Sequence, residues 1–588
     1  MRRLLPAAAA AASGALTALA LPLVISAISL RPLDPRGHLE LVAWFSLVPV
    51  LLAVRGIRSS WRAAWLGLLA GVVYFFCAIY WVGHAMTEFG GLSLGLSGLA
   101  LTLLVLYAAA HWMIALGVAT RIRLRLGWPL WAVLPPVWAA TELLRNHLFS
   151  GFPWANLGYT QVRTLPVAQL AALAGPYGIA ALVVVVNAVL AEVIAARRAR
   201  ARLPVRALST AAAALVLAIG YGYVHLASVR REMAAAPAIS LGIVQPNVDQ
   251  ARSNSRAENV RYILPRLVQP TLEADRAGVD LVVWPEAAYP RPVPPMLPSF
   301  DVPGAGVPRL ERAHLLAGVS TFEWVHAGGA EPRPSQGNRL FMVTPDLRVI
   351  GRYQKLHLVP FGEYVPDVVQ AILPFLRQVV PMASEASAGA DYAVLSFTPT
   401  PTTPGGEARA SVALSTPADA GEAAAPAVAR PEVWIAPLIC FDAIFPDLVG
   451  RFARKEPSPD LLVNVTNDAW YGYSSGPYQF LAIVQLRAIE ARRTIARSAV
   501  AGVSALILPT GELAPGAIDV GPVDPELAPD RDEPARLLLT EAPLLSGRTI
   551  YTRVGDLFAW ACALFAAGAF LFTWAWPLAR RAPRTPAT

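Results

Sequence analysis

The segment Val433-Trp-Ile-Ala-Pro-Leu-Ile-Cys440 is a short apolar run that ends in a cysteine. Its length and its content of β-branched and aromatic residues favour a buried strand. The chain has three cysteines, and the other two, Cys77 and Cys562, lie within long apolar segments. Cys440 is therefore the single thiol of the polar part of the chain, where no disulfide can form and a lone thiol needs another explanation.

Similar short runs occur on both sides of this segment, between about residues 238 and 542. Turn residues and helical stretches separate them, and this alternation indicates an α/β domain whose strands are covered by helices on at least one face. We expect a helix over residues 476–497. The expected strands are 239–245, 281–284, 315–320, 340–343, 433–440, 461–466 and 503–508.

Residues 384–430 interrupt this domain with a low-complexity stretch rich in Ala, Pro, Thr and Gly. A stretch of this composition can bury little apolar surface, so we expect most of it to be a mobile insertion without a packed core. A short apolar piece, residues 392–397, lies inside it.

Long apolar segments make up the rest of the chain. Hydrophobic residues form 55% of the 588 residues and charged residues 15%, a balance that soluble domains rarely reach. About 20 helical residues cross the hydrocarbon core of a membrane. We therefore predict a transmembrane domain of about seven helices in residues 1–230 and a C-terminal transmembrane helix at 557–578. The seven earlier segments are 5–30, 39–54, 63–82, 92–119, 128–144, 175–195 and 207–227.

Arginines mark every second connection between these segments, and basic loops stay in the cytoplasm. The domain at 238–542 is therefore expected outside the cytoplasm. A cleaved signal peptide is an alternative reading of the first segment and leaves this orientation unchanged. Despite a net charge of +9, the arginines form no periodic basic face, so nucleic acid is not expected as a partner. The arginines that set the orientation are 2 and 3; 55, 58 and 62; 121, 123 and 125; 197, 198, 200, 202 and 206; and 580, 581 and 584.

Three reactive side chains stand at the ends of predicted or short apolar strands. Glu286 ends Leu281-Val-Val-Trp-Pro-Glu286, Lys355 ends Arg352-Tyr-Gln-Lys355, and Cys440 ends the segment quoted above. A carboxylate can take the thiol proton, the thiolate can attack an acyl carbonyl, and an ammonium can stabilise the oxyanion. Each residue alone has an ordinary structural explanation: a core cysteine, a solvated turn carboxylate or a surface lysine. Together they supply the roles that covalent acyl transfer needs.

The order and surroundings of these residues resemble a known triad. Trp284-Pro-Glu286, Lys355-x-His357-Leu-Val-Pro-Phe-Gly-Glu363 and Ile439-Cys440-Phe-Asp442 are similar to the Glu-Lys-Cys motifs of the nitrilase, or carbon-nitrogen hydrolase, superfamily. Other segments are similar to apolipoprotein N-acyltransferases in particular. These are residues 355–366, Asn467-Asp-Ala-Trp-Tyr-Gly472, Gly151-Phe-Pro-Trp154 and Tyr551-Thr-Arg-Val-Gly-Asp556.

The resemblance implies a multi-pass α-helical membrane domain joined to an α/β nitrilase-like αββα sandwich at 238–542. It also implies a ping-pong reaction. Cys440 would take an acyl chain from a membrane phospholipid as a thioester and pass it to the α-amine of a diacylglyceryl-cysteine lipoprotein. Glu286 would be the general base. Lys355 and the backbone N–H of Phe441 would stabilise the oxyanion, and Glu363 would orient Lys355 or assist proton transfer.

Under the same resemblance, the protein would be a monomer in the bacterial inner membrane, with its catalytic domain on the periplasmic side. No cofactor and no metal are expected, because His314 and His357 are isolated in the sequence. The chain departs from the family at three places. Asp442 replaces a usual glutamate, residues 245–253 lack an expected tryptophan, and residues 497–502 lack an expected asparagine.

Other interpretations remain open at this stage. A membrane-tethered amidase or nitrilase-type hydrolase would use the same triad on small C–N bonds. A non-catalytic nitrilase-fold scaffold, for example one that supports a polyprenol-phosphate sugar transferase, would need none of the triad. Five aromatic residues near the motifs either form a lipid-facing rim or pack within the domain; they are Phe361, Tyr364, Trp470, Tyr471 and Tyr473.

Overall fold

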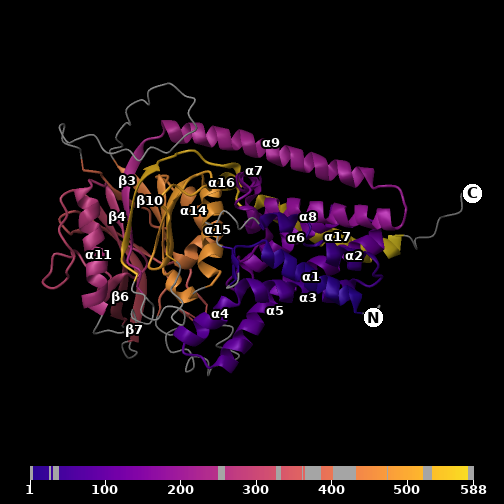
Figure 1. Ribbon diagram of the computed structural model, residues 1–588, viewed down its shortest axis with the longest axis horizontal. Helices are drawn as coiled ribbons and strands as arrows, with labels where there is room; N and C mark the ends of the chain where they lie inside the picture. The colour runs from indigo at the N-terminus through magenta and orange to yellow at the C-terminus, as the bar shows by residue number, and fades with distance from the viewer. Residues whose placement is uncertain are drawn as a thin grey trace, which may run out of the picture. The chain divides into compact units, whose positions relative to one another are not determined.

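The chain forms two compact units in a computed structural model (Figure 1). The first unit consists of residues 1–83, 98–225 and 554–588, and the second of residues 84–97 and 226–553. The structure describes residues 4–25, 28–30, 39–248, 259–325, 333–360, 362–364, 386–400, 432–472, 474–520 and 533–579.

Helices make up most of the first unit. A helix lies at each of the eight apolar segments that the sequence indicates, and five of the described helices are long and apolar enough to cross a membrane. These five are α3 (Ser60–Ile79), α5 (Leu94–Leu126), α8 (Ala171–Arg198), α9 (Val205–Ala235) and α17 (Leu557–Ala579), the last over its residues 557–575. The other three are α1 (Leu5–Leu19), α2 (Val48–Arg55) and α6 (Leu130–His147).

Helices α1 and α2, the first two in the chain, are shorter than the sequence predicts. Helix α1 ends at Leu19 instead of reaching residue 30, and Pro22 follows, which cannot continue a helix. Two short antiparallel strands come next, β1 (Leu23–Ile25) and β2 (Ile28–Leu30). Helix α2 begins only at Val48, because a 3₁₀ turn occupies Glu40–Trp44.

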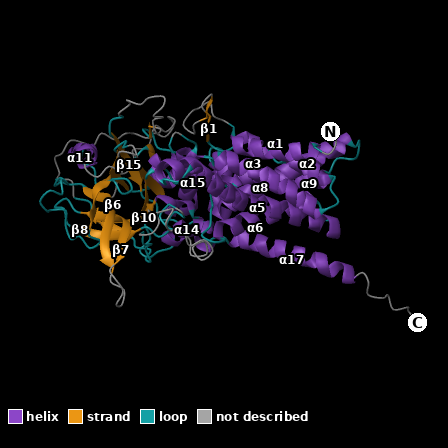
Figure 2. Ribbon diagram, turned by 90° about the horizontal axis from the view of Figure 1, so that it is seen from below, coloured by secondary structure: helices purple, strands orange, loops and turns teal. Residues whose placement is uncertain are grey.

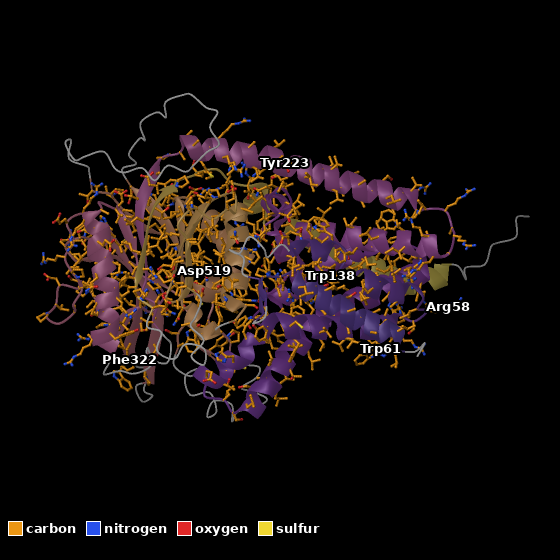
Figure 3. The ribbon with its side chains drawn as sticks, in the orientation of Figure 1. Arg58, Trp61, Trp138, Tyr223, Phe322 and Asp519 are labelled. Carbon is orange, nitrogen blue, oxygen red and sulfur yellow. The ribbon has the colours of Figure 1, made fainter. Side chains whose placement is uncertain are left out.

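Helix α6 lies in the interior of the first unit. It contains two prolines and the charged residues Glu142 and Arg145, and both charged side chains are buried. Trp138 on this helix is also buried, and it lies among the helices of this unit in Figure 3.

The second unit contains two β-sheets. One sheet has the order β15-β3-β4-β6-β7-β8, with β5 paired to β6. Helix α11 (Asn259–Arg276) packs against this sheet. Its strands are β3 (Ala238–Gln245), β4 (Leu281–Val283), β5 (Tyr289–Val293), β6 (His314–Val325), β7 (Arg333–Val343), β8 (Val349–Gln354) and β15 (Arg536–Pro543).

The other sheet has the order β14-β13-β12-β11-β10-β9 and is covered by α14 (Pro446–Ala453) and α15 (Gly476–Ala491). Its central strands β10, β11 and β12 are parallel, and parallel strands buried on both faces carry continuous apolar runs. The strands are β9 (Leu395–Phe397), β10 (Val433–Ile439), β11 (Leu461–Thr466), β12 (Thr494–Ala499), β13 (Gly502–Ile507) and β14 (Ile518–Val520).

The two sheets face each other, through contacts such as those of β12 with β3 and of β10 with β7. Within this unit, α11 lies on one side of the strands and α14 and α15 lie on the other (Figures 1 and 2). The αββα sandwich that the resemblance implies is therefore confirmed.

One predicted helix is wrong in part. The sequence predicts a helix over 476–497, but α15 ends at Ala491 and β12 begins at Thr494. Arg492 adopts a left-handed conformation with φ of +53°, which ends the helix and turns the chain into the strand. Arg497, predicted on a helix, therefore lies in the middle of a buried sheet.

The predicted strands all occur, and β6 and β7 extend further than expected. Within the low-complexity stretch, the apolar piece 392–397 contains β9, which pairs antiparallel with β10. That part of the stretch belongs to the sheet. Residues 401–431 lie outside the described residues, as do 249–258, which hold most of the segment that lacks the expected tryptophan.

Candidate active site

Cys440 lies at a sharp turn at the carboxyl end of β10. Strand β10 ends at Ile439, and Cys440 begins a 3₁₀ helix, Cys440–Ile444. Its φ is +46°, in the left-handed region that residues with a side chain rarely adopt. Phe441 is in the first turn of this short helix, where backbone N–H groups have no partner within the helix. The turn thus places a thiol next to backbone donors at the edge of the sheet.

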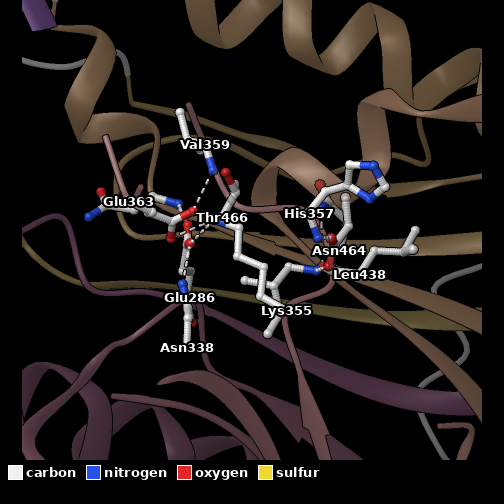
Figure 4. A network of polar contacts seen from close by, with 12 residues as sticks. Glu286, Asn338, Lys355, His357, Val359, Glu363, Leu438, Asn464 and Thr466 are labelled. Atoms are coloured by element: carbon white, nitrogen blue, oxygen red, sulfur yellow. Dashed lines mark hydrogen bonds and ion pairs between the residues drawn. The ribbon is translucent and has the colours of Figure 1, made fainter. Parts of the chain in front are cut away.

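Glu286 and Lys355 come from the opposite sheet. Glu286 follows β4, and Lys355 directly follows β8. Lys355 Nζ lies 3.2 Å from Glu286 Oε1 and 2.9 Å from Glu363 Oε1 (Figure 4). Lys355 is only 1% exposed, so a single buried ammonium bridges two carboxylates.

Further donors fix both carboxylates. Asn338 Nδ2 on β7 donates to Glu286 Oε1 at 2.7 Å, and the backbone N–H of Asn467 donates to Glu286 Oε2 at 2.9 Å. Glu363 Oε2 accepts from the backbone N–H of Val359 at 2.7 Å (Figure 4). The loop after Lys355 therefore folds back so that its own carboxylate reaches the lysine.

The charges of this cluster act on the thiol. Burial alone would lower the pKa of Lys355, but the carboxylates of Glu286 and Glu363 raise the pKa well above its usual value. Burial, with the nearby Glu286 carboxylate, raises the pKa of the Cys440 thiol, which Lys355 only partly opposes. The raised pKa favours the protonated thiol at rest. A base must therefore remove its proton during the reaction.

Asp442 ties the nucleophile turn to the lysine strand and loop. Its carboxylate accepts hydrogen bonds from the Tyr353 hydroxyl at 2.8 Å, the His357 N–H at 2.8 Å and the Ile439 N–H at 3.0 Å. Tyr353 and His357 flank Lys355 on either side. Burial raises the pKa of Asp442 to about 6. The side chain that is one methylene shorter than the family's usual glutamate still reaches three donors.

The structure thus brings Glu286, Lys355, Glu363, Phe441 and Asp442 to the surroundings of Cys440. Of the five aromatic residues that either form a lipid-facing rim or pack within the domain, Tyr364 and Trp470 are half-buried, whereas Tyr471 is buried. Phe361 and Tyr473 lie outside the described residues. Whether the rim contacts lipid stays a prediction.

Two features near the site were missed from the sequence. Residues 84–97, placed in the membrane domain by hydropathy, group with the second unit, and a Cβ added at Gly472 would come within 2.6 Å of His84 Nε2. Behind Cys440, the buried side chains of Thr466, Asp468 and Arg497 form a hydrogen-bonded chain. An arginine between the small or apolar residues Ile495, Ala496, Ser498 and Ala499 was the signal that could have revealed the second feature.

Comparison with known proteins identifies relatives of both parts of the chain. Residues 13–189 match the apolipoprotein N-acyltransferase N-terminal domain, and residues 240–521 match the carbon-nitrogen hydrolase domain. An apolipoprotein N-acyltransferase of Geobacter metallireducens is 32% identical over 553 residues, which cover 92% of this chain and 93% of the relative. One of Caulobacter vibrioides is 30% identical over 80% of this chain and 83% of the relative. Among solved structures, a mutant of the Nesterenkonia AN1 amidase, from the nitrilase superfamily, aligns with a TM-score of 0.32 and 15% identity, over 54% of this chain and 93% of that chain.

Proposed function

The chain belongs to the apolipoprotein N-acyltransferase family, and on that premise we propose that Cys440 carries the acyl group during transfer. The chain is an acyltransferase of the carbon-nitrogen hydrolase superfamily that N-acylates lipoproteins. We further propose a membrane phospholipid as the acyl donor and the α-amine of a diacylglyceryl-cysteine as the acceptor.

One observation carries the assignment of the catalytic residues. The buried Lys355 ammonium bonds to both Glu286 and Glu363, and Glu286 and Lys355 both act electrostatically on the Cys440 thiol. A general base, a cation and a nucleophile from two different sheets therefore share one site. This is the set of groups that covalent acyl transfer requires.

In the first half-reaction, Glu286 takes the thiol proton as Cys440 Sγ attacks the ester carbonyl of the phospholipid. Lys355 and the Phe441 N–H stabilise the oxyanion that forms. The C–O bond to the glycerol then breaks, and the leaving oxygen receives the proton from Glu286. The products are a thioester on Cys440 and a lysophospholipid.

In the second half-reaction, the lipoprotein amine attacks the thioester carbonyl. Glu286 accepts a proton from the attacking nitrogen, the C–S bond breaks, and the sulfur recovers its proton. The products are an amide and the free thiol. Glu363 bonds to Lys355 throughout, so we assign it to holding the ammonium in place.

A membrane location suits both substrates. Extracting an acyl chain into water costs about 0.8 kcal/mol per methylene, so an enzyme in the membrane avoids a large penalty. The chain carries several helices capable of crossing a membrane. We propose that the protein is a monomer of the bacterial inner membrane with its second unit on the periplasmic side, as the arginine pattern indicates.

The decisive experiment is thioester trapping. Purified protein is incubated with phospholipid that carries a labelled acyl chain, and label on the protein is measured before and after neutral hydroxylamine, which cleaves thioesters. We expect wild type to be labelled and Cys440→Ala to remain unlabelled. Cys562→Ala is the matched control and should be labelled like wild type.

Three results would contradict the proposal. They are equal labelling of wild type and Cys440→Ala, no labelling of wild type, and release of free fatty acid at the same rate with and without a diacylglyceryl lipopeptide acceptor. The last result would instead favour the hydrolase alternative.

A further inference from the structure

A chain of buried polar side chains lies beside Cys440, at the carboxyl end of β11 and on the neighbouring strand β12. Its first member is Thr466, the last residue of β11, which follows Val465 as Cys440 follows Ile439, and Val465 and Ile439 are paired in the parallel sheet. Thr466 therefore lies beside Cys440, and its side chain favours a lower pKa of the thiol. Thr466 is fully buried. It lies near Glu286 and Lys355 in Figure 4.

The Thr466 hydroxyl is hydrogen-bonded to Asp468. Thr466 Oγ1 donates to Asp468 Oδ1 at 3.0 Å. A hydroxyl has one proton to donate and can also accept. With its proton directed to Asp468, the Thr466 oxygen is available as an acceptor for the Cys440 S–H, and the same hydroxyl can donate to the sulfur once the thiol is ionised.

Asp468 is held in turn by Arg497. The Arg497 Nη2 atom lies 3.0 Å from Asp468 Oδ1 and 2.7 Å from Oδ2, and both side chains are completely buried. Leaving either charge unpaired in the interior would be costly. The pair therefore fixes the carboxylate that orients the Thr466 hydroxyl.

Arg497 also connects back to the strand of the nucleophile. Its Nη1 atom donates to Asn464 Oδ1 at 2.5 Å, and Asn464 Nδ2 donates to the Leu438 carbonyl at 3.3 Å. Leu438 precedes Cys440 by two residues on β10. Hydrogen bonds thus join Thr466, Asp468, Arg497 and Asn464 to β10, the strand that carries Cys440 at its end.

We propose that Thr466 is a further catalytic residue, whose hydroxyl turns from Asp468 to the sulfur when Cys440 loses its proton, and that Asp468 and Arg497 are positioning residues acting through it. This proposal rests on the acyl-transfer function above. The S–H proton passes to Glu286, and the Thr466 proton reorients without leaving its oxygen. Asp468 keeps the Arg497 N–H groups as donors, so no carboxylate is left unpaired in the thiolate state.

Other groups also act on the sulfur. Glu286 and Asp468 oppose its ionisation and Lys355 favours it, while Tyr471 is close enough for the thiolate to raise the pKa of its phenol. Among these groups, Thr466 and Tyr471 carry neutral hydroxyls, and that of Thr466 is the one held by a hydrogen bond to Asp468, from which it can turn to the sulfur. Its effect can therefore be separated from theirs by removing the hydroxyl alone.

The test is the rate of alkylation of Cys440 by iodoacetamide as a function of pH, followed by mass spectrometry of the Cys440 peptide. Thr466→Val removes the hydroxyl and keeps the shape. A hydrogen bond to an ion is worth roughly a factor of ten or more, so we expect alkylation about tenfold slower than wild type at mildly alkaline pH and a rate profile displaced to higher pH. Thr466→Ser retains the hydroxyl and should stay within about threefold of wild type.

A matched control is Thr494→Val. Thr494 is a fully buried threonine on the neighbouring strand β12, and its hydroxyl donates to the Pro543 carbonyl. Its substitution should leave the alkylation profile unchanged. The inference is overturned if Thr466→Val reacts like wild type, if Thr466→Ser is as slow as Thr466→Val, or if Thr494→Val slows alkylation equally.

The positioning role of Asp468 predicts that its substitution speeds up alkylation of Cys440, whereas Thr466→Val slows it. In Asp468→Asn, a weaker acceptor replaces the carboxylate and a negative charge is removed, so the thiolate becomes easier to form and alkylation at a given pH becomes severalfold faster. In Thr466→Val/Asp468→Asn, the gain should be smaller than in the single variant. An equal gain in both backgrounds would show that Asp468 acts by charge alone and would overturn its positioning role.

These measurements need no lipid substrate. Failure of wild type to form a thioester would refute the proposed function and leave the alkylation result standing. An unchanged alkylation profile in Thr466→Val would refute this inference and leave thioester formation standing.

Discussion

The two units each bury a carboxylate and a cation, yet they use them differently. In the second unit, Lys355 bonds to the side chains of Glu286 and Glu363 next to a thiol. In the first unit, Glu142 and Arg145 lie one turn apart on α6 and bind mainly the chain that follows the helix. Glu142 Oε1 accepts from the Leu157 N–H at 2.9 Å and from Trp138 Nε1 at 3.1 Å.

Arg145 completes this second arrangement. It donates to the Trp154 carbonyl at 2.7 Å and to the Asn156 side chain. The Gly151-Phe-Pro-Trp154 segment is thereby fastened to α6. Buried charges that bond to backbone groups hold a segment in place, whereas charges that converge on an ionisable sulfur can move protons. The residue types alone do not distinguish these two uses, and their partners do.

The strongest test of this comparison is Glu286→Gln. The amide keeps the shape but cannot take the thiol proton, and loss of a general base typically slows a reaction by about 10² to 10⁴-fold. We expect thioester formation to fall by that factor. The melting temperature should change little, because Lys355 keeps Glu363 as a partner. Near-normal labelling of this variant would remove Glu286 from the mechanism.

Arg145→Met should lower the melting temperature and leave thioester formation unchanged, the reverse of what we expect for Glu286→Gln. It leaves the buried Glu142 without its neighbouring cation and removes two donors from the 154–156 segment, a change that costs about 3–5 kcal/mol in comparable buried sites. We expect a clear fall in the melting temperature measured in detergent. Thioester formation per folded molecule should stay near that of wild type. A catalytic loss with an unchanged melting temperature would show that the two clusters are not separate in function.

Asp442→Asn tests the link between the nucleophile turn and the lysine strand through pH. The pKa of Asp442 is raised in the fold, from an ordinary 3.8 to about 6, so its protonated form is favoured by folding. This contribution is present in full below the ordinary pKa and is lost as the pH rises through about 6. At roughly 1.4 kcal/mol per pKa unit, it amounts to about 3 kcal/mol at most.

The melting temperature of wild type should therefore rise relative to that of Asp442→Asn when the pH falls from about 7.5 to 5. Asp447→Asn, which removes a half-buried carboxylate on α14 that is paired with Arg451, controls for the loss of a charge. A constant difference between wild type and Asp442→Asn across this range would contradict the buried position of Asp442.

The smallest effect is expected from Glu142→Gln, which exchanges glutamate for glutamine as Glu286→Gln does, but in the first unit. The glutamine oxygen can still accept from the Leu157 N–H and from Trp138 Nε1, so two hydrogen bonds survive. We expect a loss of about 1 kcal/mol, seen as a small drop in melting temperature, with thioester formation unchanged. A loss of labelling as large as that of Glu286→Gln would break the comparison.

The sequence revealed the candidate site better than the fold around it. Glu286 and Cys440 each lie at the end of a predicted apolar strand, which strand patterns locate well, whereas the strand before Lys355, β8, was not among the predicted ones. Their convergence could not be read from periodicity, because β4 and β8 belong to one sheet and β10 to the other. Only the family resemblance indicated that they meet.

The errors have specific physical causes. Arg497 was assigned to a helix because the left-handed turn at Arg492 has no glycine to mark it. The first apolar segment was overextended because hydropathy does not register where a proline ends a helix. Thr466 and Asp468 were overlooked because their role depends on hydrogen bonds across strands, which a single sequence does not display.

The left-handed backbone at Cys440 has a consequence for the evolution of this fold. A side chain at such a φ costs of order 1–3 kcal/mol, which glycine does not incur. Cys440→Gly should therefore melt at a higher temperature than Cys440→Ala. A gene copy released from selection for acyl transfer would encode a more stable protein if glycine replaced this cysteine. The cysteine at this position therefore lowers the stability of the fold and is retained for its reactivity.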